Sequence, residues 1–235
     1  MQKLNLWLTL SSVSVLLVTV ERFSPTTQII LQPYDFLRLH EVLQMLLIIL
    51  FTALIPFMVF LELSRKDSTR KRIEETLLSV LFITGVYFYA TGNGVHETAG
   101  YIFNSFCDTV NIQAGVCGSS FFNDYYFGNL LYFIGGYLMT IVLILLKRKN
   151  MPATFDRKNW VILLVNAVVF AFAIFAYSAF DRVLVGLIYS LVTTLTILFL
   201  LVSSNKKYNQ LPYTTYALVT YALGTTASLI VRFLH

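Results

Sequence analysis

The stretch VLQMLLIILFTALIPFMVFLEL, residues 42–63, is a continuous apolar run whose only charged residue, Glu62, lies near its end. A helix needs roughly 20 apolar residues to cross a hydrocarbon core of about 30 Å. No water is present there to bind backbone N–H and C=O groups, so a crossing segment must satisfy them internally as a helix. The alternation of a membrane β-barrel strand is absent from this run. The stretch therefore predicts a transmembrane helix.

The rest of the chain has a composition that suits the same environment. Of its 235 residues, 57% are hydrophobic and 12% are charged, whereas a soluble protein carries about 25% charged residues. Further apolar segments of similar length predict an all-α, polytopic membrane protein, a bundle of about seven transmembrane helices in one domain, residues 1–235. The expected spans are roughly 4–20, 42–63, 76–96 or beyond, 126–146, 160–178, 183–203 and 213–233.

The first span has two interpretations. Met1–Lys3 gives the short basic start of a signal peptide, but VTVERF follows the apolar run without the small residues that cleavage requires. We expect a retained anchor, and cleavage would leave six spans.

The basic residues predict the orientation of the bundle. Segments 64–75, 147–159 and 204–212 connect alternate spans and, together with Lys3, hold 13 of the 17 Lys and Arg residues. Short loops rich in Lys and Arg stay cytoplasmic, so we predict a cytoplasmic amino terminus. The net charge of +5 then reflects topology and contact with anionic lipids rather than nucleic-acid binding.

The opposite, exported side is expected to hold all three histidines and most acidic residues. Both cysteines, Cys107 and Cys117, also lie there, in the longest connection. An exported face is oxidising enough for a disulfide, and the spacing of the pair is not that of a structural zinc site. We predict a disulfide, with two free thiols as the alternative.

A polar stripe ends the third span. In TGNGVHETAGYIFN, residues 91–104, the side chains of Asn93, His96, Glu97 and Asn104 share one face if the helix continues past His96. Gly92 weakens the helix there, and small residues also let a neighbouring helix or a ligand approach closely. The stripe is therefore expected to face something other than lipid.

Other helix ends at the same depth carry similar groups. His40 and Glu41 begin the second span, Asp124 lies before the fourth, and Asp181 and Arg182 join the fifth to the sixth. We interpret His40, Glu41, Asn93, His96, Glu97 and Asp124 as one outward-facing site. The alternative is that these are ordinary polar residues of wet helix ends.

Two chemistries suit such a site. His40, Glu41 and His96 are candidate ligands for a divalent metal such as zinc, which would activate water. Without a metal, His96, Glu97, Asp124 and Asn93 would do acid–base work. The chain has no G-x-S-x-G, H-E-x-x-H, Walker or G-x-G-x-x-G motif.

The function that these residues favour is a membrane-embedded hydrolase acting on a lipid or lipid-linked substrate. Two alternatives stay open: a non-catalytic lipid-binding or assembly protein, and a small-solute transporter. Transport is less favoured because ionisable groups near the bilayer midplane, which ion pathways use, are missing apart from Glu62.

Overall fold

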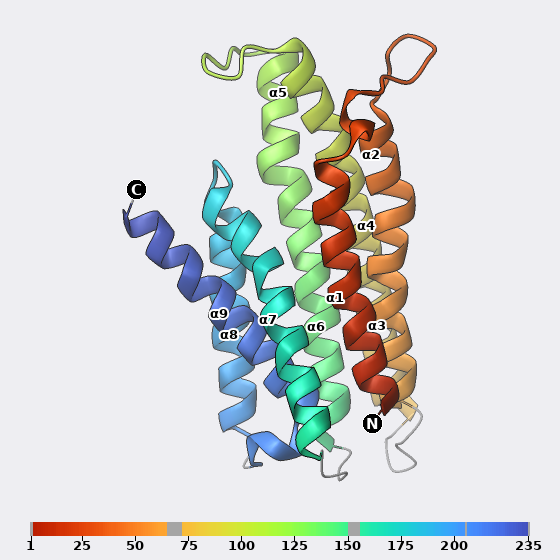
Figure 1. Ribbon diagram of the computed structural model, residues 1–235, viewed down its shortest axis with the longest axis vertical. Helices are drawn as coiled ribbons and strands as arrows, with labels where there is room; N and C mark the ends of the chain where they lie inside the picture. Colours follow the sequence, from red (N-terminus) through yellow and green to blue (C-terminus); the bar gives the residue numbers. More distant parts are fainter. Residues whose placement is uncertain (1, 65–71, 150–155, 205, 235) are drawn as a thin grey trace.

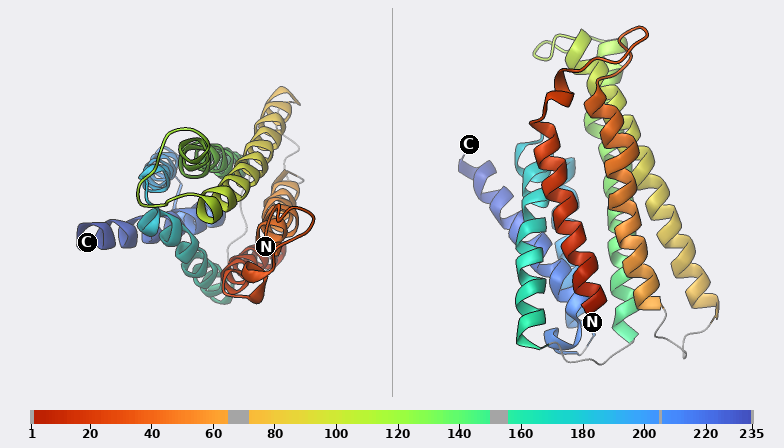
Figure 2. Two further views of the ribbon diagram at one scale, coloured as in Figure 1. Left: turned by 90° about the horizontal axis from the view of Figure 1, so that it is seen from above. Right: turned by 45° about the vertical axis from the view of Figure 1, so that its right-hand side comes forward.

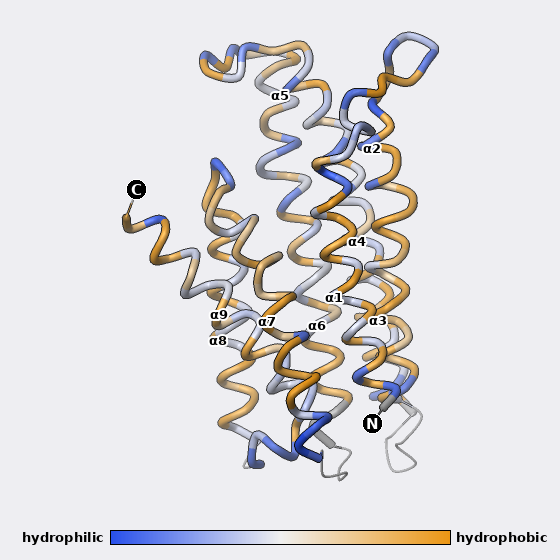
Figure 3. Tube along the Cα trace, in the orientation of Figure 1, coloured by the Kyte–Doolittle hydropathy of each residue, from blue (hydrophilic) through white to orange (hydrophobic). Residues whose placement is uncertain are grey.

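The computed structural model describes residues 2–64, 72–149, 156–204 and 206–234, which form a bundle of long helices (Figure 1). Within these residues, seven helical segments are long and apolar enough to cross a membrane, as predicted. They are Lys3–Arg22, Leu39–Ser64, Ile73–Phe106, Val116–Leu146, Arg157–Phe180, Val185–Val202 and Pro212–Leu234. Apolar residues dominate the middle of the bundle and hydrophilic ones gather toward its ends (Figure 3). The chain is therefore an integral, multi-pass membrane protein.

The helices that make up these spans alternate in direction. The long helices are α1 (Gln2–Arg22), α3 (Ile49–Ser64), α4 (Arg72–Phe106), α6 (Asn129–Lys149), α7 (Arg157–Phe180), α8 (Val185–Val202) and α9 (Pro212–Leu234). The described part also contains the short helices α2 (Leu39–Leu43) and α5 (Val116–Phe122) and the 3₁₀ turns η1 (Pro25–Gln28) and η4 (Tyr208–Gln210).

The end of the bundle where α1 and α4 finish and α2 and α5 begin is here called the histidine end (Figures 1 and 2). The helix ends that the predicted basic segments connect lie at the opposite end, and residues 65–71, 150–155 and 205 of those segments lie outside the described part of the chain. Assignment of that opposite end to the cytoplasm rests on the loop charges and stays a prediction.

Two spans contain a π-helical segment. Residues Gln44–Ile48 form η2 between α2 and α3, and Asn123–Gly128 form η3 between α5 and α6. The fourth span consequently begins about ten residues before its predicted start, because Val116–Gly128 continue the helix instead of forming a loop. π-Helical turns are rare and frequently occur at functional sites. Both of these lie toward the histidine end.

Glycines let α4 and α6 pack with their backbones in contact. A Cβ atom added at Gly92 would lie 2.2 Å from the Tyr132 nitrogen, and one at Gly135 would lie 2.3 Å from the Tyr89 nitrogen. A Cβ at Gly128 would lie 2.8 Å from the His96 nitrogen. Since only glycine lacks a Cβ, this approach depends on these positions. The close packing fixes α4 against η3 and α6, the elements that carry the site.

Candidate functional site

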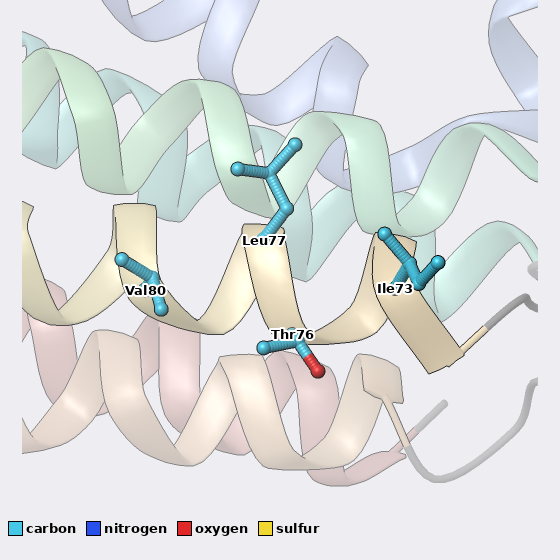
Figure 4. Close-up of a pocket in the computed structure, with 4 residues that line it drawn as sticks. All are labelled: Ile73, Thr76, Leu77 and Val80. Atoms are coloured by element: carbon cyan, nitrogen blue, oxygen red, sulfur yellow. The ribbon is translucent and has the colours of Figure 1, made fainter.

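An apolar pocket in the described part of the chain has no ionisable group in its lining. It has a volume of about 450 Å³ and is lined by Ile73, Thr76, Leu77 and Val80, near the start of α4 (Figure 4). At a rise of 1.5 Å per residue, Val80 lies roughly 24 Å along the helix from His96. The polar chemistry of the protein therefore lies away from this pocket, at the histidine end.

His96 and Asp124 form the closest histidine–carboxylate contact on α4. Nδ1 of His96 is 2.6 Å from Oδ1 of Asp124 and 3.2 Å from the Asp124 backbone oxygen. The Asp124 side chain is almost fully buried, whereas the imidazole is 31% exposed. A proton on Nδ1, which faces the Asp124 carboxylate and hydrogen-bonds the Asp124 backbone oxygen, leaves Nε2 as the acceptor nitrogen of the neutral ring. The pair is thus arranged to accept a proton at Nε2.

Local backbone structure explains how a carboxylate reaches His96. Asp124 belongs to the first turn of the π-helical segment η3. Gly100, one turn after His96 on α4, leaves the space that the carboxylate fills, because a Cβ there would lie 3.2 Å from Oδ1 of Asp124. The Asp124 carboxylate therefore occupies space that a larger residue at position 100 would restrict.

Glu97 and Asn93 are buried beside this pair on α4. Glu97 is 7% exposed and Asn93 is 9% exposed. Glu97 interacts electrostatically with His96, and also with Arg22 and His40 from the first two spans. Among the described residues, Nδ2 of Asn93 has no hydrogen-bond partner. Since buried amide groups are normally bonded, Asn93 is available to a ligand at this site.

A second histidine–carboxylate pair forms between the first two spans. Nδ1 of His40 is 2.6 Å from Oε2 of Glu21, in the last turn of α1. Glu21 also accepts hydrogen bonds from Gln44 Nε2 at 2.8 Å and from Thr26 Oγ1 at 2.6 Å. Glu21 was not among the predicted site residues. Only its position could have indicated it, because Glu21 is a carboxylate at a helix end on the same side of the bundle as the histidines.

Glu41 has a local role in the structure. Its Oε2 accepts the Arg38 backbone N–H at 2.9 Å, which caps the start of α2. Within the described part of the chain, no three His, Cys, Asp or Glu side chains are grouped to hold a metal ion. Metal binding by His40, Glu41 and His96 therefore stays a prediction. The contacts described for these residues form between protein groups.

Asp181 extends the charged cluster from the connection between α7 and α8. Its Oδ2 accepts a hydrogen bond from Asn129 Nδ2 at 3.1 Å, and it interacts electrostatically with His96. Burial raises the pKa of the Asp181 carboxyl above its ordinary value. Arg232 of α9 stabilises this connection by donating to the backbone oxygens of Ser178 and Asp181, both at 2.7 Å.

Asp181→Asn is expected to stabilise the protein at neutral pH. A raised native pKa means that the carboxyl contributes stability below its unfolded pKa, near 4, and that this contribution is lost as the pH rises through the native pKa. Asparagine stays neutral and still accepts the bond from Asn129. We expect a gain of about 2 °C in unfolding midpoint at pH 7.5, small because the group is partly exposed, and no gain at pH 4. An equal gain in unfolding midpoint at pH 7.5 and at pH 4 would show that the raised pKa of Asp181 is not the cause.

The connections at the histidine end are fixed to α4. The predicted disulfide between Cys107 and Cys117 is present, with a Cα–Cα distance of 5.6 Å. The Tyr101 hydroxyl donates to the Asp35 backbone oxygen, and Arg38 donates to the Ser105 hydroxyl at 3.2 Å. These contacts hold both loops beside the two histidine–carboxylate pairs.

The structure brings His96 into contact with Asp124, leaves Glu97 and Asn93 buried on the same helix, and places His40 with Glu21 rather than with Glu41. No protein-family model, curated protein or solved structure matches this chain. The functional argument therefore rests on the geometry of these side chains.

Proposed function

We propose that the protein is a membrane-embedded hydrolase that cleaves a carboxylic ester of a lipid or lipid-linked molecule at the histidine end. The contact that carries this proposal is the 2.6 Å pair of His96 and Asp124, whose imidazole remains 31% exposed. A buried carboxylate that holds Nδ1 orients Nε2 as a general base. The position at the end of transmembrane helices suits a substrate whose ester group lies near the membrane surface.

Water is the nucleophile that this arrangement favours. Both cysteines of the chain are joined in the disulfide, so neither supplies a thiolate. His96 Nε2 would take a proton from water while the water oxygen bonds to the ester carbonyl carbon. Asn93, with its buried and unpartnered Nδ2, would donate to an oxygen of the bound ester. From the orientation predicted by the loop charges, this reaction is expected on the exported side of the membrane.

The test is hydrolysis by the purified protein in liposomes made from a total lipid extract, followed by mass spectrometry of released fatty acids. Wild type is expected to release fatty acid with and without EDTA, and His96→Gln to lower the rate at least about 100-fold. Ser79→Ala, at a partly exposed position of α4 whose hydroxyl bonds only the backbone of its own helix, is the control. Wild type without hydrolysis, or His96→Gln with full activity, would overturn the proposal. Loss of activity in EDTA alone would favour the metal-dependent form.

Transport of a neutral solute is the second candidate, and tyrosines inside the bundle favour it. The hydroxyls of Tyr89 and Tyr132 are 3.0 Å apart, and those of Tyr189 and Tyr221 are 2.5 Å apart. These pairs offer uncharged polar groups on four helices, as a neutral solute would need. Glycerol uptake into proteoliposomes that is lost in Tyr132→Phe and retained in His96→Gln would favour transport over hydrolysis.

A further inference from the structure

The disulfide joins the helix that carries His96 to the helix that leads to Asp124. Cys107 directly follows α4, and Cys117 lies in the first turn of α5, which continues into η3. Both cysteines are partly exposed, and residues 110–116 between them are exposed, so a small dithiol can reach the bond. A covalent link between two segments restricts how far they can separate. The disulfide therefore limits movement of η3 away from α4.

Three aromatic rings pack between the linked helices and η3. The Phe103 side chain of α4 is fully buried, and its ring centre lies 5.3 Å from that of Phe121 on α5 and 6.1 Å from that of Tyr125 in η3. The rings of Phe121 and Tyr125 are 4.9 Å apart. Such contacts weaken steeply when the rings separate, so this packing requires α4 and α5 to stay together. Tyr125 directly follows Asp124, and the three rings therefore help to hold the Asp124 carboxylate beside His96.

Arg182 joins the loop closed by the disulfide to Tyr125. Its Nη1 donates to the Thr109 backbone oxygen at 2.8 Å, and its guanidinium carbon lies 5.8 Å from the centre of the Tyr125 ring, a cation–π contact. The preceding residue, Asp181, accepts from Asn129 Nδ2, which also donates to the Tyr125 backbone oxygen at 3.1 Å. The disulfide loop, the connection of α7 to α8 and η3 thus meet at the histidine end (Figures 1 and 2).

We propose that the Cys107–Cys117 disulfide is a redox switch for the candidate site and that Arg182 is a positioning residue within it. A dithiol reduces the bond: it supplies two electrons and two protons, the S–S bond breaks, the protein gains two thiols and the dithiol becomes a disulfide. α5 can then separate from α4, and Asp124 moves away from Nδ1 of His96. The effect on activity rests on the proposed hydrolase function, whereas the effect on the histidine ring does not.

NMR of the protein labelled with ¹⁵N-histidine tests the switch directly. The chain has only three histidines, so their ring signals can be assigned by substitution. Dithiothreitol is expected to shift the ring nitrogens of His96 and to leave those of His40 unchanged, because His40 contacts Glu21 of the first span. Cys107→Ser combined with Cys117→Ser should show the shifted His96 signals without reductant and no further change with it. Unchanged His96 signals after complete reduction, or equal shifts of both rings, would overturn the proposal.

Backbone hydrogen exchange locates the segment that the disulfide controls. Exchange of residues 116–128 is expected to become at least about 10-fold faster on reduction, and exchange in α9 to stay the same. In the oxidised protein, Arg182→Gln should accelerate exchange in the same segment and shift the His96 signals in the same direction. Arg157→Gln, an exposed arginine at the opposite end of α7, is the matched control and should do neither. The same exchange rates in both variants would exclude Arg182 as a positioning residue.

Hydrolysis in the liposome assay separates this proposal from the proposed function. Dithiothreitol is expected to lower fatty-acid release by wild type at least about 10-fold, because an imidazole without its carboxylate is a poorer base, and reoxidation should restore it. The variant without cysteines should release fatty acid at the low rate with or without reductant. Equal release by oxidised and fully reduced wild type would overturn the switch and leave the hydrolase in place. If wild type releases none in either state, the proposed function fails, and the His96 ring signals still decide whether the disulfide controls the pair.

Discussion

Gly92→Ala is expected to destabilise the bundle by about 3 kcal/mol or more, whereas Gly94→Ala, two residues further on, is expected to be neutral or mildly stabilising. A Cβ at Gly92 would lie 2.2 Å from the Tyr132 nitrogen and 2.8 Å from its Cα, so backbone must move. Overpacking against side chains already costs about 1–3 kcal/mol. A Cβ at Gly94 meets nothing within 4 Å, and alanine favours helix over glycine by up to about 1 kcal/mol.

Thermal unfolding in detergent, monitored by fluorescence-detected size exclusion, measures this difference. The two substitutions are chemically identical and lie in the same turn of α4, so any effect of alanine on insertion or expression is shared. Similar midpoints for Gly92→Ala and Gly94→Ala would show that α4 and α6 do not pack through Gly92.

Asp124→Asn is expected to lower ester hydrolysis at least about 100-fold while leaving the protein folded. Asparagine fits the same space beside Gly100 but can donate from its amide to Nδ1 of His96. That bond favours the tautomer with the proton on Nε2, which can no longer accept one from water. The change is therefore expected in the rate and in the ¹⁵N shifts of His96, rather than in the unfolding midpoint.

Asp108→Asn is the matched control for this substitution. Asp108 lies in an exposed turn, and its carboxylate accepts the backbone N–H groups of Val110 and Asn111. It is 12 residues after His96 and at the same end of the bundle, but its carboxylate accepts from Val110 and Asn111 rather than from the ring. An equal loss of activity in both variants would show that Asp124 does not act through His96.

The polar stripe on α4 could be predicted because its members belong to one helix. Asn93, His96 and Glu97 lie on one face once the helix continues to Phe106, which the structure confirms. The π-helical segment that brings in Asp124 has no sequence pattern of its own, and the early start of the fourth span was missed for that reason. Asp124 was predicted from its charge and depth alone.

The pairing of His40 with Glu21 could not be predicted from the sequence, and the reason is geometric. Neighbouring residues in a helix point in directions about 100° apart, so the His40–Glu41 dipeptide does not by itself show which carboxylate meets the imidazole. Glu41 turns back to cap its own helix, and His40 meets Glu21 from α1. Only the packing of the first span against the second determines that contact.

The sequence by itself determined the environment and the elements: apolar runs long enough to cross a bilayer must be helices, because hydrocarbon offers backbone groups no other partner. It also predicted the disulfide, since both cysteines lie in one connection that is expected to be exported, with two free thiols as the alternative. The tertiary structure alone decided which carboxylate serves which imidazole and which glycines bring α4 against α6. These contacts join residues from separate helices, and their distances depend on how whole helices pack rather than on any local pattern.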